Sequence, residues 1–75
     1  MNLYKKTNSD SGVYAYEIKP EAIVVQFNDG KTYLYTYQSA GRKYIEEMKR
    51  LAETGKGLTT FINKNVKKKY EKKLD

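Results

Sequence analysis

The fold is decided by residues 23–35, which read Ile-Val-Val-Gln-Phe-Asn-Asp-Gly-Lys-Thr-Tyr-Leu-Tyr. β-branched and aromatic residues recur on both sides of Asp29-Gly30, a pattern typical of two antiparallel strands joined by a tight turn. Gly30 suits this turn because a residue without a Cβ adopts a positive φ at no steric cost. The stretch therefore predicts a hairpin with strands over residues 22–27 and 31–37.

The length of the turn sets the register of the hairpin, and the register decides which face the tyrosines occupy. A two-residue loop would place Val25 opposite Leu34 and send the tyrosines to the other face. A three-residue loop with Gly30 as a bulge places Val25 opposite Tyr33. We favour the bulged register because it gathers the large side chains of both strands on one buried face. Those side chains are Ile23, Val25, Phe27, Tyr33 and Tyr35.

A third strand is predicted before the hairpin. Residues 13–19 alternate with period two, which indicates a strand whose Tyr14, Tyr16 and Ile18 face inward. A turn that contains the only proline joins this strand to the hairpin, because proline cannot donate to a strand ladder. Residues 1–12 show no apolar period, and we expect a lead-in loop there.

After residue 37 the apolar residues recur at spacings of three and four, which predicts a helix. Ser39 is its expected N-cap, and Gly55 is expected to end it in a left-handed conformation. The apolar stripe of this helix comprises Ala40, Tyr44, Ile45, Met48, Leu51 and Ala52. Its outer face carries opposite charges four residues apart, which indicates solvation rather than binding.

A second helix is expected to open after Gly57, with Thr59 or Thr60 as its cap. Its apolar positions are Leu58, Phe61, Ile62 and Val66. Whether it continues to Leu74 stays open at this point. The order β-β-β-α-α indicates an α+β fold, a three-stranded antiparallel meander followed by two helices packed on one face.

The composition excludes several classes of site. The chain has 75 residues, no cysteine and no histidine. We therefore expect one domain over residues 1–75, without a disulfide, a thiolate or imidazole metal site, a cysteine nucleophile or a Ser-His-Asp triad. The longest apolar run, residues 22–25, is too short for a transmembrane span or a leader. We expect a soluble cytoplasmic protein with no cofactor and no membrane partner.

Two local features resemble functional sites, one catalytic and one anion-binding, but ordinary structural roles explain them better. Glu46 and Glu47 are adjacent on the predicted helix and each has a basic neighbour, so they are poor candidates for general acid–base catalysis. The segment Gly55-Lys56-Gly57 suggests an anion site at a helix start, but it lacks Walker spacing and suits a turn between helices. We expect no enzymatic activity and no small-molecule substrate.

The charge is concentrated at the C-terminus. Of the net charge of +6, a balance of +4 lies in residues 64–75, the basic segment. Such a run attracts phosphates, although a solvated tail has the same composition. We assign its lysines as candidate nucleic-acid contacts, with Tyr70 as a stacking ring and Asn63 as a hydrogen-bonding group. The lysines are Lys64, Lys67, Lys68, Lys69, Lys72 and Lys73.

Several stretches together resemble the KTSC domain. They are residues 23–30 (Ile-Val-Val-Gln-Phe-Asn-Asp-Gly), Tyr33-Leu34-Tyr35, Gly57, and residues 61–67 (Phe-Ile-Asn-Lys-Asn-Val-Lys) leading to Tyr70. The KTSC domain is a short bacterial module that occurs alone and at the C-terminus of some lysyl-tRNA synthetases. The resemblance implies a candidate RNA-binding role.

The resemblance covers residues 11–72, with two departures. Ser39-Ala40 stands where the family usually has Val-Pro, and Tyr70 lacks the second aromatic residue that normally follows two positions later. The second departure bears on whether a pair of aromatic rings in the tail stacks on bases.

The tyrosines of the third predicted strand have two possible roles. They could form a stacking platform for bases, as in sheet-based RNA binders. They could also fill the core, which a chain without tryptophan and with two phenylalanines needs. We predict that Tyr33 and Tyr35 are core residues and leave Tyr37 open.

The function expected from these features is a small non-enzymatic module that binds RNA or another polyanion through its basic segment. The alternative is a protein-interaction module. Its partner, or a second copy in a homodimer, would add a strand to an exposed edge of the sheet.

Overall fold

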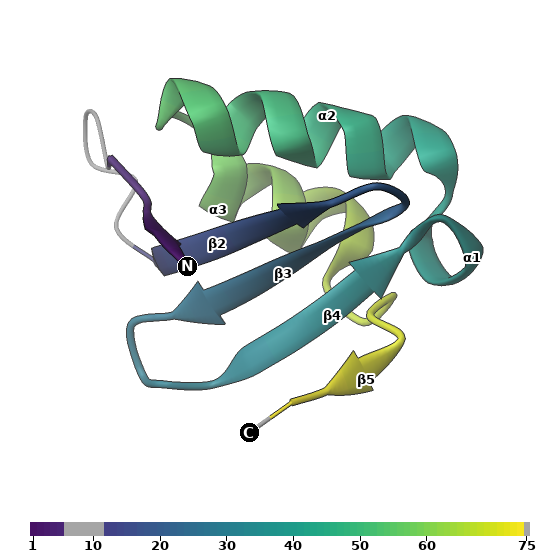
Figure 1. Ribbon diagram of the computed structural model, residues 1–75, viewed down its shortest axis with the longest axis horizontal. Helices are drawn as coiled ribbons and strands as arrows, with labels where there is room; N and C mark the ends of the chain where they lie inside the picture. Colours follow the sequence, from purple (N-terminus) through teal and green to yellow (C-terminus); the bar gives the residue numbers. More distant parts are fainter. Residues whose placement is uncertain (6–11, 75) are drawn as a thin grey trace.

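The structure is a computed structural model that describes residues 1–5 and 12–74. An antiparallel sheet and a set of helices form an α+β fold, as expected (Figure 1). The elements of the described residues are, in chain order, β1 (Asn2–Leu3), β2 (Val13–Lys19), β3 (Ala22–Phe27), β4 (Thr32–Thr36), α1 (Tyr37–Ala40), α2 (Arg42–Thr54), α3 (Leu58–Phe61), the π-helical turn η1 (Ile62–Val66) and β5 (Lys72–Lys73).

The sheet of the described residues has five strands in the order β1-β2-β3-β4-β5, rather than the three that were expected. The predicted meander is its centre, β2 to β4. The additional strands β1 and β5 lie at the two edges, in the regions expected to be a lead-in loop and a basic segment. A two-residue strand carries no periodicity, so neither is visible in the sequence.

The bulged register of the hairpin is confirmed. Val25 lies opposite Tyr33 and Ile23 opposite Tyr35. The Gly30 N–H donates to the Phe27 carbonyl at 2.9 Å, and Gly30 has φ +91°. The large side chains of both strands therefore share the face that the helices cover.

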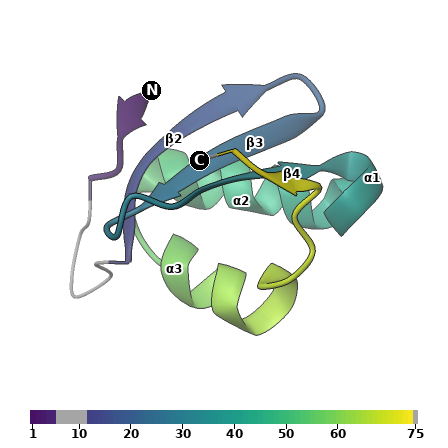
Figure 2. The same cartoon turned by 90° about the horizontal axis from the view of Figure 1, so that it is seen from below.

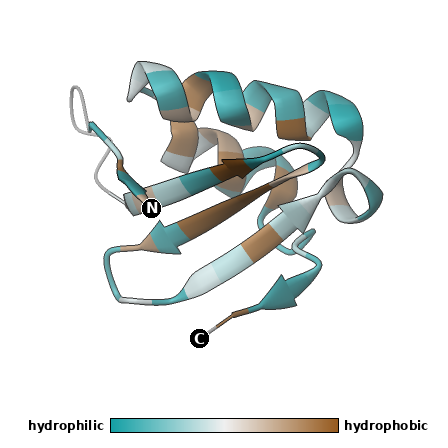
Figure 3. Ribbon diagram, viewed as in Figure 1, coloured by the Kyte–Doolittle hydropathy of each residue, from teal (hydrophilic) through white to brown (hydrophobic). Residues whose placement is uncertain are grey.

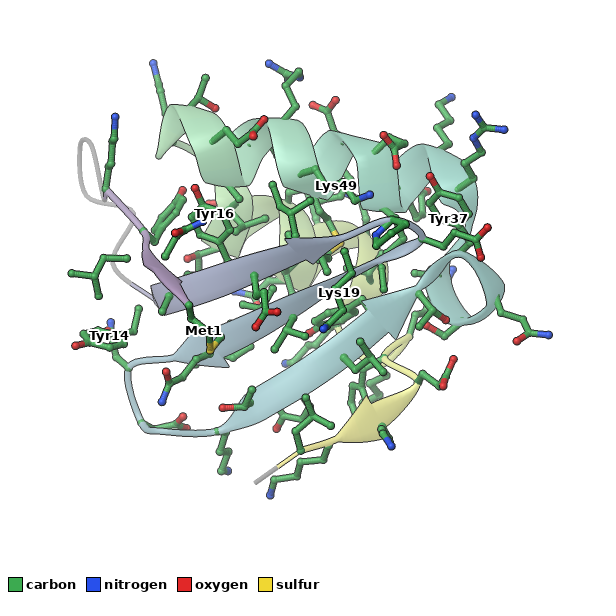
Figure 4. All side chains as sticks on the ribbon, viewed as in Figure 1. Met1, Tyr14, Tyr16, Lys19, Tyr37 and Lys49 are labelled. Atoms are coloured by element: carbon green, nitrogen blue, oxygen red, sulfur yellow. The ribbon has the colours of Figure 1, made fainter. Side chains whose placement is uncertain are left out.

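The expected orientation of β2 is wrong in part. The register against β3 shifts between Val13 and Ala15, so Tyr14 is the extra residue of a β-bulge. Tyr14 is consequently 47% exposed, while Val13 and Tyr16 reach the core. Figure 4 shows Tyr14 at the outer end of the sheet and Tyr16 close to α2. Ile18, also predicted to face inward, lies near the end of the strand and is 36% exposed.

The core lies between the sheet and the helices. Seen from below, β2 and β3 lie on one side of the molecule and α3 on the other (Figure 2). Apolar residues from both layers meet there, and β3 is mostly hydrophobic whereas β5 is hydrophilic (Figure 3). The largest fully buried side chains are Tyr35, Ile23, Ile45, Met48, Leu58, Ile62, Val13, Val25 and Val66.

The first helical region begins earlier than expected. Thr36, not Ser39, is the N-cap, and the two side chains form a reciprocal capping box around the start of α1. Gly41, at φ +99°, separates this single turn from α2. The end of α2 is as predicted, since Gly55 is left-handed with φ 76°.

The charged pairs on α2 form at a spacing of three, Glu46 with Lys49 and Glu47 with Arg50, rather than four.

The second helix begins at Leu58, and its N-cap Gly57 provides no side-chain cap. The predicted caps Thr59 and Thr60 are inside the helix, and the Thr59 hydroxyl instead accepts a hydrogen bond from the Val13 N–H at 3.1 Å. The helix does not continue to the end of the chain. It widens into η1, stops at Val66, and the chain returns to the sheet as β5.

Candidate aromatic and basic cleft

The helices leave part of the inner sheet face open near the β3–β4 turn. A cleft of about 490 Å³ lies there. Residues of the hairpin line one side of it, and residues of η1 and the segment that follows line the other. The hairpin contributes Phe27, Asn28, Asp29, Lys31, Tyr33 and Tyr35, and the opposite side contributes Ile62, Asn63, Lys67, Lys68 and Tyr70. Gly12, which precedes β2, also lines the cleft.

Four aromatic rings run from the core to the mouth of this cleft. Tyr35 is buried, with 1% exposure, whereas Tyr33 and Phe27 are half-buried and Tyr70 is 38% exposed. The ring centroids of Tyr33 and Tyr70 are 4.6 Å apart, and the Phe27 ring meets Tyr33 edge-on at 5.8 Å. The rings therefore form one continuous apolar surface that is open at its outer end.

The core role predicted for the strand tyrosines is confirmed for Tyr35 and holds only in part for Tyr33. Burial raises the pKa of the Tyr35 phenol well above its ordinary value, and the neighbouring phenols of Tyr33 and Tyr70 raise it further. Tyr33 packs against the core cluster but also lines the cleft. It therefore contributes both to folding and to the open surface.

Tyr37, which the sequence left open, lies outside this cleft. It is the first residue of α1, and its hydroxyl donates to Glu46 Oε2 at 2.5 Å. That hydrogen bond raises the pKa of Tyr37 and lowers the pKa of Glu46. The Lys49 ammonium lies 5.7 Å from the Tyr37 ring centroid, and Figure 4 shows the two side chains at the same end of the sheet. Tyr37 on α1 thus contacts Glu46 and Lys49 on α2, outside the cleft.

Main-chain pairing with β4 holds Tyr70 at the cleft. The Glu71 N–H donates to the Leu34 carbonyl at 2.6 Å, and the Leu74 N–H donates to the Thr32 carbonyl at 2.8 Å. The Thr36 hydroxyl also donates to Glu71 Oε1 at 2.9 Å. Because Tyr70 directly precedes these contacts, the edge strand fixes its position beside Tyr33.

The structure brings together only part of the predicted site. Asn63, Lys67, Lys68 and Tyr70 line the cleft. The other lysines are not among its lining residues. The Lys69 ammonium lies 5.7 Å from the centroid of the Tyr44 ring. Lys64 lies on η1, and Lys72 and Lys73 form β5.

All six lysines are exposed, although residues 71–74 of the basic segment are hydrogen-bonded to β4. None of the ion pairs among residues 1–5 and 12–74 involves them. Their charges are therefore available to an anionic partner.

Most of the cleft residues are not among the predicted site residues, and Phe27, Tyr33 and Lys31 belong to this group. Phe27 and Tyr33 are predicted core residues, and Lys31 is predicted to begin the second strand of the hairpin. The bulged register was a usable signal, because it places Phe27 and Tyr33 on one face at the end of the hairpin. How far the helices reach over that end could not be inferred from the sequence.

In the part of the chain that the structure describes, acidic side chains do not gather in groups of three or more that could hold a metal ion. No helix of those residues has the length and apolar character needed to span a bilayer.

Comparisons of the chain with protein-family models, with curated proteins and with solved structures gave no match. The resemblance to the KTSC domain therefore stays a prediction from the residues quoted for it.

Proposed function

We propose that this chain is a small non-enzymatic module of the cytoplasm that binds RNA through its basic segment. One observation carries the proposal. The six lysines of that segment are exposed and form no ion pair among the described residues, and two of them, Lys67 and Lys68, line an open cleft that also contains aromatic rings. Lysines contact phosphates, and aromatic rings stack on bases, so the two features suit the same polymer.

The fold of the basic segment favours this proposal over a solvated tail. Backbone hydrogen bonds attach residues 71–74 to β4. An ordered backbone has already lost conformational entropy on folding, so contacts with phosphates cost less to form. A frayed tail would lose that entropy only on binding.

The test is a titration of labelled single-stranded RNA at about 50 mM and about 200 mM salt. We expect micromolar binding at the lower concentration. If three or four lysines contact phosphates of a single strand, the slope of log affinity against log salt is about −2 to −3. Affinity should then fall about 15- to 60-fold between the two conditions. Absence of binding at the lower salt concentration would end the proposal.

A charge-matched pair of variants locates the contacts. The double variant Lys67→Gln, Lys68→Gln removes two charges beside the cleft, and Lys43→Gln, Lys56→Gln removes two exposed charges from α2 and the turn after it. We expect the first variant to lower both affinity and salt slope, and the second to change them much less. Equal losses would indicate attraction by net charge alone.

A DNA oligonucleotide of the same sequence shows whether the ribose hydroxyl contributes.

The alternative, a protein-interaction module or homodimer that uses a sheet edge, has less support. The long strands β2 and β4 are already paired along part of their outer edges by β1 and β5. Each of these edge strands has two residues, which is short for pairing with another chain. We expect a monomer in sedimentation, and a stable dimer would favour the alternative.

A further inference from the structure

The open aromatic surface suggests more than phosphate binding. This chain buries most of Tyr4, Tyr16 and Tyr35, with 4%, 9% and 1% exposure. The rings of Phe27, Tyr33 and Tyr70 are instead partly exposed and gathered in one cleft. Its volume of about 490 Å³ lies within the range typical of sites for small ligands.

The polar groups at the cleft suit a heterocyclic base. Asn63 lines the cleft on η1, is exposed, and its amide has no hydrogen-bond partner among the described residues. The nearby Asn65 differs, because its amide donates to the Phe61 carbonyl at 3.1 Å within the helix. A primary amide both donates and accepts, as the edge of a base requires.

The charges around the cleft are those expected for a ribose-phosphate backbone. Lys31 lies on the hairpin side, and Lys67 and Lys68 lie on the opposite side. Asp29 is the one carboxylate among the described lining residues, and its Oδ1 accepts a hydrogen bond from the Lys31 N–H at 3.0 Å. Cationic groups therefore flank the aromatic surface on both sides and outnumber the acidic group.

We propose that the cleft takes one unstacked base of a single-stranded RNA. The base stacks on the exposed aromatic surface, Asn63 hydrogen-bonds to its edge, and Lys31, Lys67 and Lys68 contact the flanking phosphates. This inference rests on the proposed function and names the part of the RNA that the site recognises. A duplex does not fit the same role, because stacking on neighbouring pairs covers both faces of each base.

The experiment compares an oligoadenylate of about eight nucleotides with an abasic ribose-phosphate chain of equal length. Tyr70→Leu and Phe27→Leu each remove a ring from the cleft but keep an apolar side chain. We expect each to weaken oligoadenylate binding about 5- to 150-fold, the usual effect of losing one stacked ring. The salt slope and binding of the abasic chain should not change. Asn63→Ala should weaken oligoadenylate binding without affecting the abasic chain.

Tyr14→Leu is the matched control, because Tyr14 is 47% exposed and does not line the cleft. It should bind both oligomers as the parent chain does. Circular dichroism of each variant shows whether it is folded. Tyr70→Leu should disturb the core less than Phe27→Leu, because the Tyr70 ring is the more exposed of the two.

The outcomes separate the two proposals. If the parent chain and the folded ring variants bind oligoadenylate equally, with a salt slope retained, the base site is wrong and the phosphate-binding function stands. Equal affinity of the parent chain for the abasic chain and for oligoadenylate would also overturn the base site. If neither oligomer binds at about 50 mM salt, both proposals fail.

Discussion

A two-residue strand lies at each edge of the sheet, β1 beside β2 and β5 beside β4, and a tyrosine stands next to each strand. The two tyrosines have different surroundings. Tyr4 is buried, with 4% exposure, and its hydroxyl accepts a hydrogen bond from the Leu58 N–H at 3.1 Å. Tyr70 is 38% exposed and packs on Tyr33 at the cleft.

The difference shows that similar backbone pairing can place a tyrosine ring in two different surroundings. At the N-terminal edge it inserts a ring between the sheet and α3, which links the chain end to the core. At the C-terminal edge it holds a ring at the surface, beside lysines. The first arrangement should contribute mainly to stability, and the second mainly to binding.

Replacement of Tyr4 should have the largest effect on stability. Tyr4→Ala removes a buried ring and leaves the Leu58 amide without its acceptor, so the free energy of unfolding should fall by about 3–5 kcal/mol. Tyr70→Ala should cost about 1 kcal/mol or less, because the ring is already partly solvated. Urea denaturation of both variants measures the contrast.

Tyr4→Phe keeps the comparison usable if Tyr4→Ala does not fold. It retains the ring and removes the hydroxyl that accepts from the Leu58 N–H, which should cost about 1–3 kcal/mol. Equal stability of the Tyr4→Phe and parent chains would show that the buried hydroxyl contributes nothing.

The buried end of the aromatic surface should also respond to alkaline pH. Burial raises the pKa of Tyr35 above its ordinary value, so the folded state favours the protonated phenol. The associated stability is fully present below the unfolded pKa of about 10 and is lost as the pH rises above it. We expect the free energy of unfolding to decline there, and to decline less in Tyr35→Phe. Urea denaturation across alkaline pH measures both chains, and parallel declines would contradict the assignment.

The central part of the fold was predictable because its signals are local. Asp29-Gly30 fixes a turn, and the alternation around it fixes a register that the structure confirms. The bulge at Tyr14 was not predictable from the sequence. An inserted residue leaves the alternation of residue types unchanged, but it turns the residues that precede it to the opposite face of the sheet. The edge strands were not predictable either, because each depends on a partner far away in the sequence.

The candidate site was predictable only on one side. The concentration of lysines in the basic segment predicts a site there, which includes Lys67, Lys68 and Tyr70. Phe27 and Tyr33 carry the same apolar pattern as core residues, and their exposure depends on where the helices stop. That is a property of tertiary packing, which one sequence pattern does not encode.

The contact between the edge strand and β4 should affect binding more than folding. Glu71→Ala removes the acceptor of the Thr36 hydroxyl, and we expect RNA affinity to fall about 2- to 5-fold as Tyr70 loses its fixed position. The substitution also removes a negative charge, which by itself would strengthen binding. A loss of affinity would therefore identify an effect of position, not charge.

Glu53→Ala is the control for that variant, because it removes an exposed carboxylate from α2, far along the chain from the edge strand. It should leave RNA affinity unchanged or raise it slightly. A rise of similar size in both variants would mean that the Thr36–Glu71 hydrogen bond does not position Tyr70.

The smallest expected effect is a difference in salt slope between two lysines of the basic segment, Lys67 and Lys69. The Lys69 ammonium lies 5.7 Å from the Tyr44 ring centroid, so its positive charge already interacts with an aromatic ring of the same chain. Lys67 lines the cleft and has no such ring contact among the described residues. Lys67→Gln should therefore reduce the magnitude of the salt slope for single-stranded RNA by about 0.7, the value for one phosphate contact, and Lys69→Gln should change it less. Equal changes would show that the six lysines act as a diffuse charge, and the contrast between the two edges would then rest on Tyr70 alone.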